Sequence, residues 1–431
     1  MESALLYLLG VVIVLVGLMV SIGLHEVGHL LPAKRFGVRV GQYMIGFGPT
    51  VFSKRFGETE YGLKAIPLGG YISMAGMFPP ARPGGKPRTA STGFFDTLVQ
   101  DARDVSKEGI PAGQEDRVFY KLPVPKRIVI MLGGPAMNLL LAFVFFTIAI
   151  CGFGVPAAST TVGTVFECAL PATTTQTECA PGDPAAPAAE AGMLPGDRLV
   201  SIDGEPITEW IQSTVIIRDS AGQTLDVVVE RDGAEVTLQV TPLLIERYDL
   251  DDPERVVEVG YIGVGPASEL QPQPITAVPP FVWDNTVALG ELILTLPVRL
   301  GQLVVDMVNG EERDPNGPVS IVGVGRLAGE ITGLDAPVAE RAVTVISLLG
   351  GLNLALFLFN LLPLLPLDGG HVAGALLEAV RRGIARLRGK PDPGPIDTAR
   401  FVPITLVVTV LLGVMSAFLI VVDLVNPISL F

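Results

Sequence analysis

The sequence predicts a polytopic α-helical membrane protein with four transmembrane helices, a membrane-associated β-sheet after the first helix, and one extracytoplasmic β-rich domain. Two observations carry this prediction. Of the 431 residues, 49% are hydrophobic and only 17% are charged, a balance that soluble globular proteins rarely show. The apolar residues also gather into windows long enough to cross the ~30 Å hydrocarbon layer as helices. Ala4 to Leu24, Ile128 to Ile150, Val343 to Leu367 and Val402 to Val422 are these windows.

A further apolar stretch, Phe281 to Val308, is interrupted by charged residues. Asp284, Glu291, Arg299 and Asp306 recur at intervals that suit one face of a helix. Such a pattern is typical of an amphipathic helix at the membrane surface. We therefore count four spans and expect this helix to lie on the membrane.

The charges are unevenly divided along the chain. Residues 156–340 contain 29 acidic and 8 basic residues, whereas the remainder contains 15 acidic and 22 basic residues. Loops rich in Lys and Arg stay in the cytoplasm, so 34–127 and 381–400 are predicted inside and the acidic segment outside. The chain is thus predicted to cross the inner (cytoplasmic) membrane several times, with both of its ends on the extracytoplasmic side.

These observations divide the chain into segments with different predicted structures. The membrane helices are predicted at 1–36, 126–155, 341–372 and 401–424, and the sheet at 37–77. A cytoplasmic insertion follows at 78–125, and a cytoplasmic loop at 373–400. The extracytoplasmic side holds a domain at 156–250 and a linker at 251–340, in which Asp314 to Gly329 is expected to be an irregular loop because it is rich in glycine.

The predicted extracytoplasmic domain shows short strands separated by turns, such as "RLVSIDGEPI" and "QTLDVVVERDGAEVTLQV". Its stretch "AEAGMLPGDRLVSIDGEPI" resembles PDZ domains of bacterial membrane-associated proteases, which bind extended peptides at a sheet edge. Cys168 and Cys179 flank an insertion in this domain. In an oxidising compartment they could form a disulfide, and the alternative is that both are packing residues.

The stretch "LHEVGHLL" places three ionisable residues near the cytoplasmic end of the first span. His25 and His29 are four residues apart, so on a helix both imidazoles reach one metal ion, and Glu26 lies where it can touch a metal-bound water. His-Glu-x-x-His on a helix is typical of zinc hydrolases. The alternative is a hydrogen-bonded pair of histidines, but ionisable groups at this depth cost ~2.5 kcal/mol or more each and are usually functional.

A catalytic zinc needs a third protein ligand. Asp368, in "FNLLPLLPLDGGHVAG", is the acidic residue with a suitable depth, and Pro363 and Pro366 break the helix just before it. The first and third spans both run from outside to inside, so both bring their polar residues to the cytoplasmic end. We therefore predict that His25, His29 and Asp368 bind Zn²⁺.

Several motifs occur in an order that resembles the bacterial site-2 proteases, the RseP-type intramembrane zinc metalloproteases. They are "HEVGH", "IGFGP", "IPLGGYISM", "GGPAMN", the PDZ stretch, "GPVSI" and "NLLPLLPLDGGH". The resemblance implies the same three zinc ligands, with Glu26 as general base. It also implies that Asn360 positions the substrate backbone, that the sheet aligns an unwound substrate as an added strand, and that the PDZ domain filters substrates by size.

The predicted function is an intramembrane zinc endopeptidase that cleaves single-span membrane proteins within the bilayer. By family likeness the substrate is an anti-sigma factor in regulated intramembrane proteolysis. The expected partners are this transmembrane protein and membrane lipid, with no nucleic acid. The alternative is a membrane scaffold or transporter without catalysis, in which the PDZ domain binds partners; Glu26 favours the enzyme, because binding of zinc alone does not need it.

Overall fold

A computed structural model describes the following residues: 2–79, 116–174, 176, 179–250, 252, 255–310, 313–314, 317–396 and 401–428. The chain divides into two compact units. Unit 1 comprises Met1–Gly152 and Pro274–Phe431, and unit 2 comprises Phe153–Gln273. Most of the insertion predicted at 78–125 lies outside the described residues.

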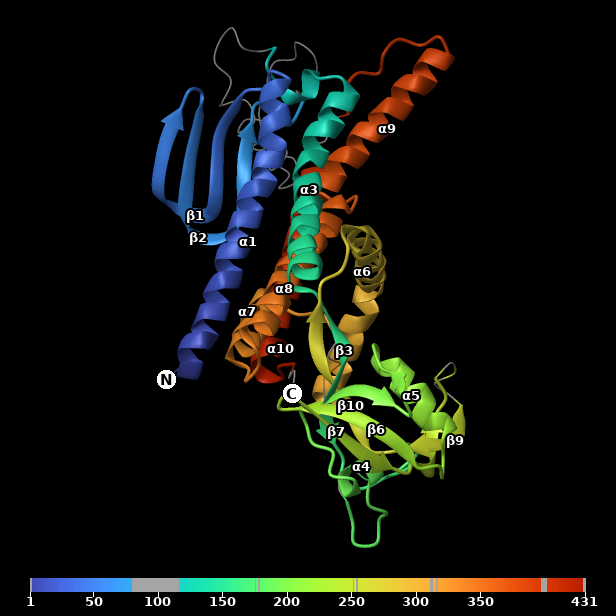
Figure 1. Ribbon diagram of the computed structural model, residues 1–431. Helices are drawn as coiled ribbons and strands as arrows, with labels where there is room; N and C mark the ends of the chain where they lie inside the picture. Colours follow the sequence, from blue (N-terminus) through green and yellow to red (C-terminus); the bar gives the residue numbers. More distant parts are fainter. Residues whose placement is uncertain are drawn as a thin grey trace. The chain divides into compact units, whose positions relative to one another are not determined.

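Unit 1 consists of long helices and one small sheet (Figure 1). Its helices are α1 (Glu2–Arg35), α3 (Val124–Thr147, continued by a π-helical segment, Ile148–Phe153), α6 (Val278–Asn309), α7 (Ile321–Gly333), α8 (Val338–Leu361), α9 (Asp368–Leu387) and α10 (Val402–Val425). Helix α3 packs against both α1 and α8, and α9 packs against α3. Helix α3 therefore contacts both α1 and the two helices that flank the Pro363–Pro366 break.

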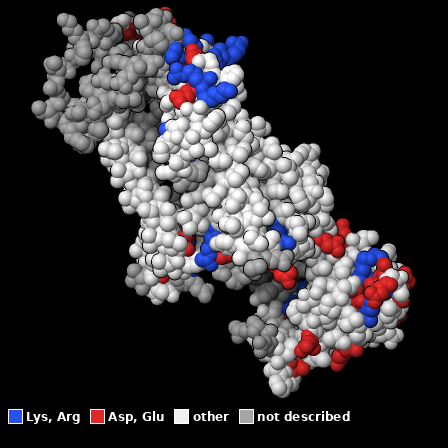
Figure 2. Space-filling view, turned by 90° about the vertical axis from the view of Figure 1, so that its left-hand side faces the viewer, with Lys and Arg blue, Asp and Glu red and all other residues white. Residues whose placement is uncertain are grey.

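Five helices among the described residues are long and apolar enough to cross a membrane: α1, α3, α6, α8 and α10. Lys and Arg side chains gather at the top of unit 1, and a broad surface below them lacks charge (Figure 2). This is the end where α1 finishes with Lys34 and Arg35 and where α3 begins. A basic end beside an uncharged belt is the pattern of a multi-pass membrane protein.

Helix α6 is the fifth candidate, which the sequence places on the membrane surface. Near its start, Phe281 packs edge-to-face on Phe146 in the last turns of α3, with ring centroids 5.1 Å apart. Near its end, Leu303 is buried with Leu419 and Val422 in the last turns of α10. In the predicted topology both contacts lie toward the extracytoplasmic side, which favours the surface placement. The four-span count therefore stays our prediction.

The helix break predicted just before Asp368, within the third predicted span, is confirmed. Helix α8 ends at Leu361 and α9 begins at Asp368, because Pro363 and Pro366 cannot donate to a helical ladder. The segment predicted as a cytoplasmic loop, 373–400, is partly helical, since α9 continues to Leu387. Its apolar residues recur every three or four positions, an amphipathic pattern that the prediction overlooked.

The irregular loop predicted for Asp314 to Gly329 is wrong over most of its length, because α7 occupies Ile321–Gly333. Ser320 caps the helix by accepting from the N–H groups of Val322 and Gly323. The glycines lie on the buried side of α7, where Gly329 packs against the ring of Tyr7 in α1. Close packing between α7 and α1 offsets the low helix propensity of glycine.

The sheet of unit 1 is built from two long bent strands, β1 (Val40–Phe56) and β2 (Thr59–Met74). The first half of β1 lies between the two halves of β2, since Tyr43 is opposite both Tyr61 and Ile72. The second half of β2 has no strand on its other side among the described residues. Phe47, Phe52 and Phe56 are exposed.

Unit 2 is an antiparallel β-domain with two short helices. Its elements are β3 (Val155–Val165), α4 (Pro187–Glu190), β4 (Arg198–Ile202), β5 (Glu205–Pro206), α5 (Trp210–Asp219), β6 (Leu225–Arg231), β7 (Ala234–Val240), β8 (Leu243–Tyr248), β9 (Val256–Tyr261) and β10 (Val264–Gln271). The main sheet has the order β10-β3-β4-β6-β7. The domain predicted at 156–250 therefore ends too early, because β10 pairs along β3 and closes the fold. Cys168 and Cys179 form a disulfide.

Candidate metal centre

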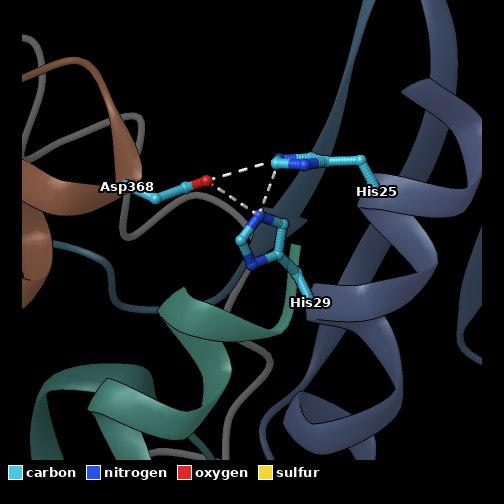
Figure 3. Close-up of side chains that lie close together, drawn as sticks. All are labelled: His25, His29 and Asp368. Carbon is cyan, nitrogen blue, oxygen red and sulfur yellow. Dashed lines mark hydrogen bonds and ion pairs between the residues drawn. The ribbon is translucent and has the colours of Figure 1, made fainter. Parts of the chain in front are cut away.

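Three side chains from α1 and α9 converge inside unit 1 (Figure 3). The Nε2 atoms of His25 and His29 lie 3.1 Å apart. The Oδ2 atom of Asp368 lies 3.3 Å from Nε2 of His25 and 3.2 Å from Nε2 of His29. The three atoms thus form a nearly equilateral triangle. Among the described residues this is the one group of three or more His, Cys, Asp or Glu side chains placed to hold a metal ion.

The triangle fits a zinc ion in both size and chemistry. Zinc is bound tetrahedrally by imidazole nitrogen and carboxylate oxygen at about 2.0–2.2 Å, which sets ligand atoms about 3.3 Å apart. The observed separations of 3.1, 3.2 and 3.3 Å match this spacing. The Oδ2 atom of Asp368 is buried, and no hydrogen bond from the described residues reaches it. A bound cation would balance the charge of this buried oxygen, which faces the two imidazoles.

Helix α3 holds the two histidines from behind. The carbonyl oxygen of Ile130 lies 2.8 Å from Nδ1 of His29. A carbonyl can only accept, so Nδ1 donates and the lone pair of the neutral ring remains on Nε2, toward Asp368. The side-chain amide nitrogen of Asn138 lies 3.0 Å from Nδ1 of His25. Both contacts come from α3, which the sequence does not mark as part of the site.

Glycines allow α3 to come this close to α1. A Cβ atom on Gly28 would lie 2.2 Å from the carbonyl oxygen of Gly133, and a Cβ on Gly133 would lie 2.0 Å from that of Gly28. A Cβ on Gly134 would lie 2.2 Å from Nε2 of His29. Glycine at positions 28 and 133 thus permits the close packing of α1 and α3, and Gly134 in addition leaves room for the metal ligands.

Glu26 is 8% exposed and lies beside the same group on α1, where it interacts electrostatically with His25, His29 and Asp368. A Cβ built on Gly70 of β2 would lie 3.1 Å from Cγ of Glu26. Glu26 is therefore close both to the three candidate ligands and to the second half of β2.

The remaining polar residues of the spans have other neighbours. Asn360 donates to the carbonyl of Leu356 in its own helix, at 3.0 Å. Asn353 donates to the hydroxyl of Ser21 at 2.9 Å and thereby links α8 to α1. His371 lines a cavity of about 20 Å³ together with Arg127, Glu378 and seven other residues. Among the described residues, no hydrogen bond joins Asn360 to the three candidate ligands.

Comparison with known proteins shows the family of the chain. The model of Peptidase family M50 matches residues 13–391, which is most of the chain. The chain belongs to peptidase family M50. The zinc metalloprotease Rip1 of Mycobacterium bovis is 33% identical over 99% of this chain and 100% of its own length. Rip1 of Mycolicibacterium smegmatis is 34% identical over 98% and 99% of the two chains. The metalloprotease MmpA of Caulobacter vibrioides is 31% identical over 87% and 89%.

This M50 peptidase is therefore a zinc-dependent metalloprotease of the site-2 protease family and a multi-pass membrane protein. The predictions of the family, of the enzyme class and of Zn²⁺ as cofactor are confirmed. Asn138 is a residue of the centre that sequence reasoning missed. The only signal for Asn138 was a polar side chain within an otherwise apolar helix, in "GGPAMN".

Proposed function

We propose that this M50 peptidase is an intramembrane endopeptidase in which His25, His29 and Asp368 hold one zinc ion and Glu26 is the general base. The observation that carries the proposal is the triangle of three donor atoms formed by two segments far apart in the chain. When bound, zinc supplies Lewis acidity, which favours deprotonation of water and polarises a peptide carbonyl. Glu26 accepts the proton of the attacking water and delivers it to the leaving amine.

We further propose that the substrate is a single-span membrane protein bound in extended form along β2. A transmembrane helix hides its carbonyls in its own hydrogen bonds, so it must unwind before it can be cut. The outer edge of β2, around Gly70 and Ile72, lies next to Glu26 and offers backbone groups for an added strand. The exposed Phe47 and Phe52 favour a sheet in contact with lipid.

Other parts of the proposal rest on the resemblance to site-2 proteases. Asn360 is proposed to position the substrate backbone, and unit 2 is proposed to be an extracytoplasmic PDZ domain that filters substrates by size. The disulfide between Cys168 and Cys179 supports an oxidising location for unit 2. The chain ends are then extracytoplasmic, in the inner membrane, and the proposed substrate is an anti-sigma factor.

A cleavage assay with a matched variant tests this proposal. The purified full-length protein and its Glu26→Gln variant are loaded with zinc and given a model single-span substrate with helix-weakening residues. We expect both proteins to bind zinc and only the wild type to cut. Equal cleavage by the two would refute the role of Glu26. Because the variant should bind substrate without cutting it, proteins that co-purify with it from the native membrane would test the proposed substrate class.

A further inference from the structure

The amide of Asn138 is placed directly behind His25. Asn138 is fully buried in α3, and its amide nitrogen lies 3.0 Å from Nδ1 of the imidazole. The Oδ1 atom of the same amide is buried and has no hydrogen-bond partner among the described residues. A buried amide with an unpaired oxygen beside a candidate metal ligand calls for a specific account, because an unmade buried hydrogen bond costs about 1–3 kcal/mol.

The chemistry of the ring determines which amide atom must face it. Nε2 of His25 points toward Nε2 of His29 and Oδ2 of Asp368. To bind a metal, Nε2 must offer a lone pair, so the neutral ring carries its proton on Nδ1. An Nδ1–H group needs an acceptor, and of the two amide atoms only the oxygen can accept. The oxygen and nitrogen of an asparagine amide exchange places by a half-turn of the amide group, with little change in shape.

We propose that Asn138 is a positioning residue that accepts a hydrogen bond from Nδ1–H of His25 through its Oδ1 atom and so fixes the ring with Nε2 free for zinc. This rests on the proposed role of His25 as a ligand. The carbonyl of Ile130 makes the equivalent contact with Nδ1 of His29, at 2.8 Å. One helix, α3, thus sets the protonation and orientation of both imidazoles of α1.

The opposite arrangement has a different chemical consequence. If the amide nitrogen of Asn138 donated to Nδ1 of His25, the ring would carry its proton on Nε2. That proton would point at Oδ2 of Asp368, 3.3 Å away, and would occupy the lone pair that zinc needs. Asn138 would then serve helix packing and would oppose binding of the metal.

Two substitutions at Asn138 separate these arrangements. Asn138→Asp keeps an oxygen acceptor and cannot donate, whereas Asn138→Leu keeps the approximate volume and can do neither. Zinc affinity is measured on the full-length protein in detergent by competition with a chromophoric chelator. We expect Asn138→Leu to weaken zinc binding by about 10- to 100-fold, the usual cost of losing a hydrogen-bond partner of a metal-bound histidine. Asn138→Asp should bind zinc at least as tightly as the wild type.

Asn353 supplies the matched controls. It is another buried asparagine of the helical bundle, and it bonds to Ser21 and to Leu349 and not to a candidate ligand. Asn353→Leu and Asn353→Asp should leave zinc affinity within about threefold of the wild type, which is small beside the expected loss for Asn138→Leu. Asn353→Leu measures how the loss of a buried amide that does not contact His25 changes zinc affinity. Asn353→Asp measures the same for a buried charge.

The possible results decide the inference in each case. Wild-type affinity in Asn138→Leu, or a loss in Asn138→Asp as large as that in Asn138→Leu, would overturn it. If Asn138→Leu does not fold, Asn138→Ala, which also removes both amide atoms, takes its place and is compared with Asn353→Ala. His25→Ala in the same assay separates this proposal from the one on which it rests. If His25→Ala binds zinc as tightly as the wild type, His25 is not a zinc ligand and both proposals fail. If His25→Ala loses zinc affinity but Asn138→Leu does not, only the positioning role of Asn138 is rejected.

Discussion

Nε2 of His29 lies 3.2 Å from Oδ2 of Asp368, although the two residues come from opposite ends of the chain. Helix α1 carries the imidazole, and the break between α8 and α9 places the carboxylate at the first residue of α9. In the predicted topology both helix segments reach the cytoplasmic side. Any change that moves α9 away from α1 should therefore separate the proposed zinc ligands.

Removal of the charge on Asp368 is expected to release the metal. Asp368→Asn keeps the shape of the side chain and removes the anionic oxygen that faces both imidazoles. Zinc affinity should fall by more than about 100-fold, since loss of an outer hydrogen-bond partner alone costs 10- to 100-fold. Metal analysis of the purified variant after dialysis measures this, and a full zinc complement would reject Asp368 as the third ligand.

A methyl group at Gly134 should disturb the centre directly. In Gly134→Ala the new Cβ would lie 2.2 Å from Nε2 of His29, and the ring cannot easily move because Nδ1 bonds to Ile130. We expect loss of zinc and of cleavage, with a strain of about 1–3 kcal/mol. Gly351→Ala is the control, because a Cβ there meets nothing within 4 Å. Retention of zinc by Gly134→Ala would show that the helices are farther apart than described.

A buried ion pair ties α9 to α3 and should matter for stability. Glu378 is 1% exposed, pairs with Arg127 and accepts from the backbone N–H of Ile396. Glu378→Ala would leave Arg127 buried without its partner, at a cost of about 3 kcal/mol or more. Thermal unfolding of the full-length protein in detergent measures the difference.

The control for this experiment is Glu330→Ala, which breaks the partly exposed pair between Glu330 and Arg326 within α7. Such a helical pair contributes only about 0.5 kcal/mol. The midpoint of unfolding should therefore fall clearly in Glu378→Ala and little in Glu330→Ala. Equal shifts would mean that the buried pair does not hold α9 in place.

Unit 2 should lose stability at acidic pH through Asp197. The Arg231 guanidinium, which donates two hydrogen bonds of 2.7 Å to this buried carboxylate, holds the pKa of Asp197 below its usual value. A carboxylate whose pKa is lowered by folding stabilises the fold above its unfolded pKa, about 3.9, and this contribution is lost as the pH falls through the folded value.

Hydrogen exchange along β6 in the full-length protein, corrected for intrinsic rates, measures this loss below about pH 4. In Asp197→Asn, protection at neutral pH should be lower, and its decline below that pH should be shallower than in the wild type. An identical decline in both proteins would assign the acid sensitivity of unit 2 to other groups.

The convergence of His25, His29 and Asp368 could be predicted from the helical spacing of the two histidines and from the direction of the spans. The spacing of His25 and His29 requires only a helix, and the depth of Asp368 follows from the direction of the spans. The contact between Asn138 and His25 could not be predicted in this way. It depends on how closely α1 and α3 approach each other. That distance is short because Gly28 faces Gly133, and the sequence alone does not show that these two glycines meet.

The errors in the fold have the same origin. The glycines of α7 suggest an irregular loop by propensity, but their burial against α1 favours a helix. The end of unit 2 depends on pairing between β3 and β10, two strands far apart in the sequence. Neither the packing nor the pairing leaves a local pattern in the residues themselves.

The most direct test of the account is X-ray absorption spectroscopy of the zinc-loaded full-length protein. A zinc ion held by these three residues should show a first shell of nitrogen and oxygen atoms at about 2.0–2.2 Å, with two imidazoles, a carboxylate and no sulfur. Substitution of His371 should leave this spectrum unchanged, because His371 is not one of the three residues whose donor atoms converge. A sulfur ligand, or three imidazoles that fall to two in the His371 variant, would contradict a zinc ion held by His25, His29 and Asp368.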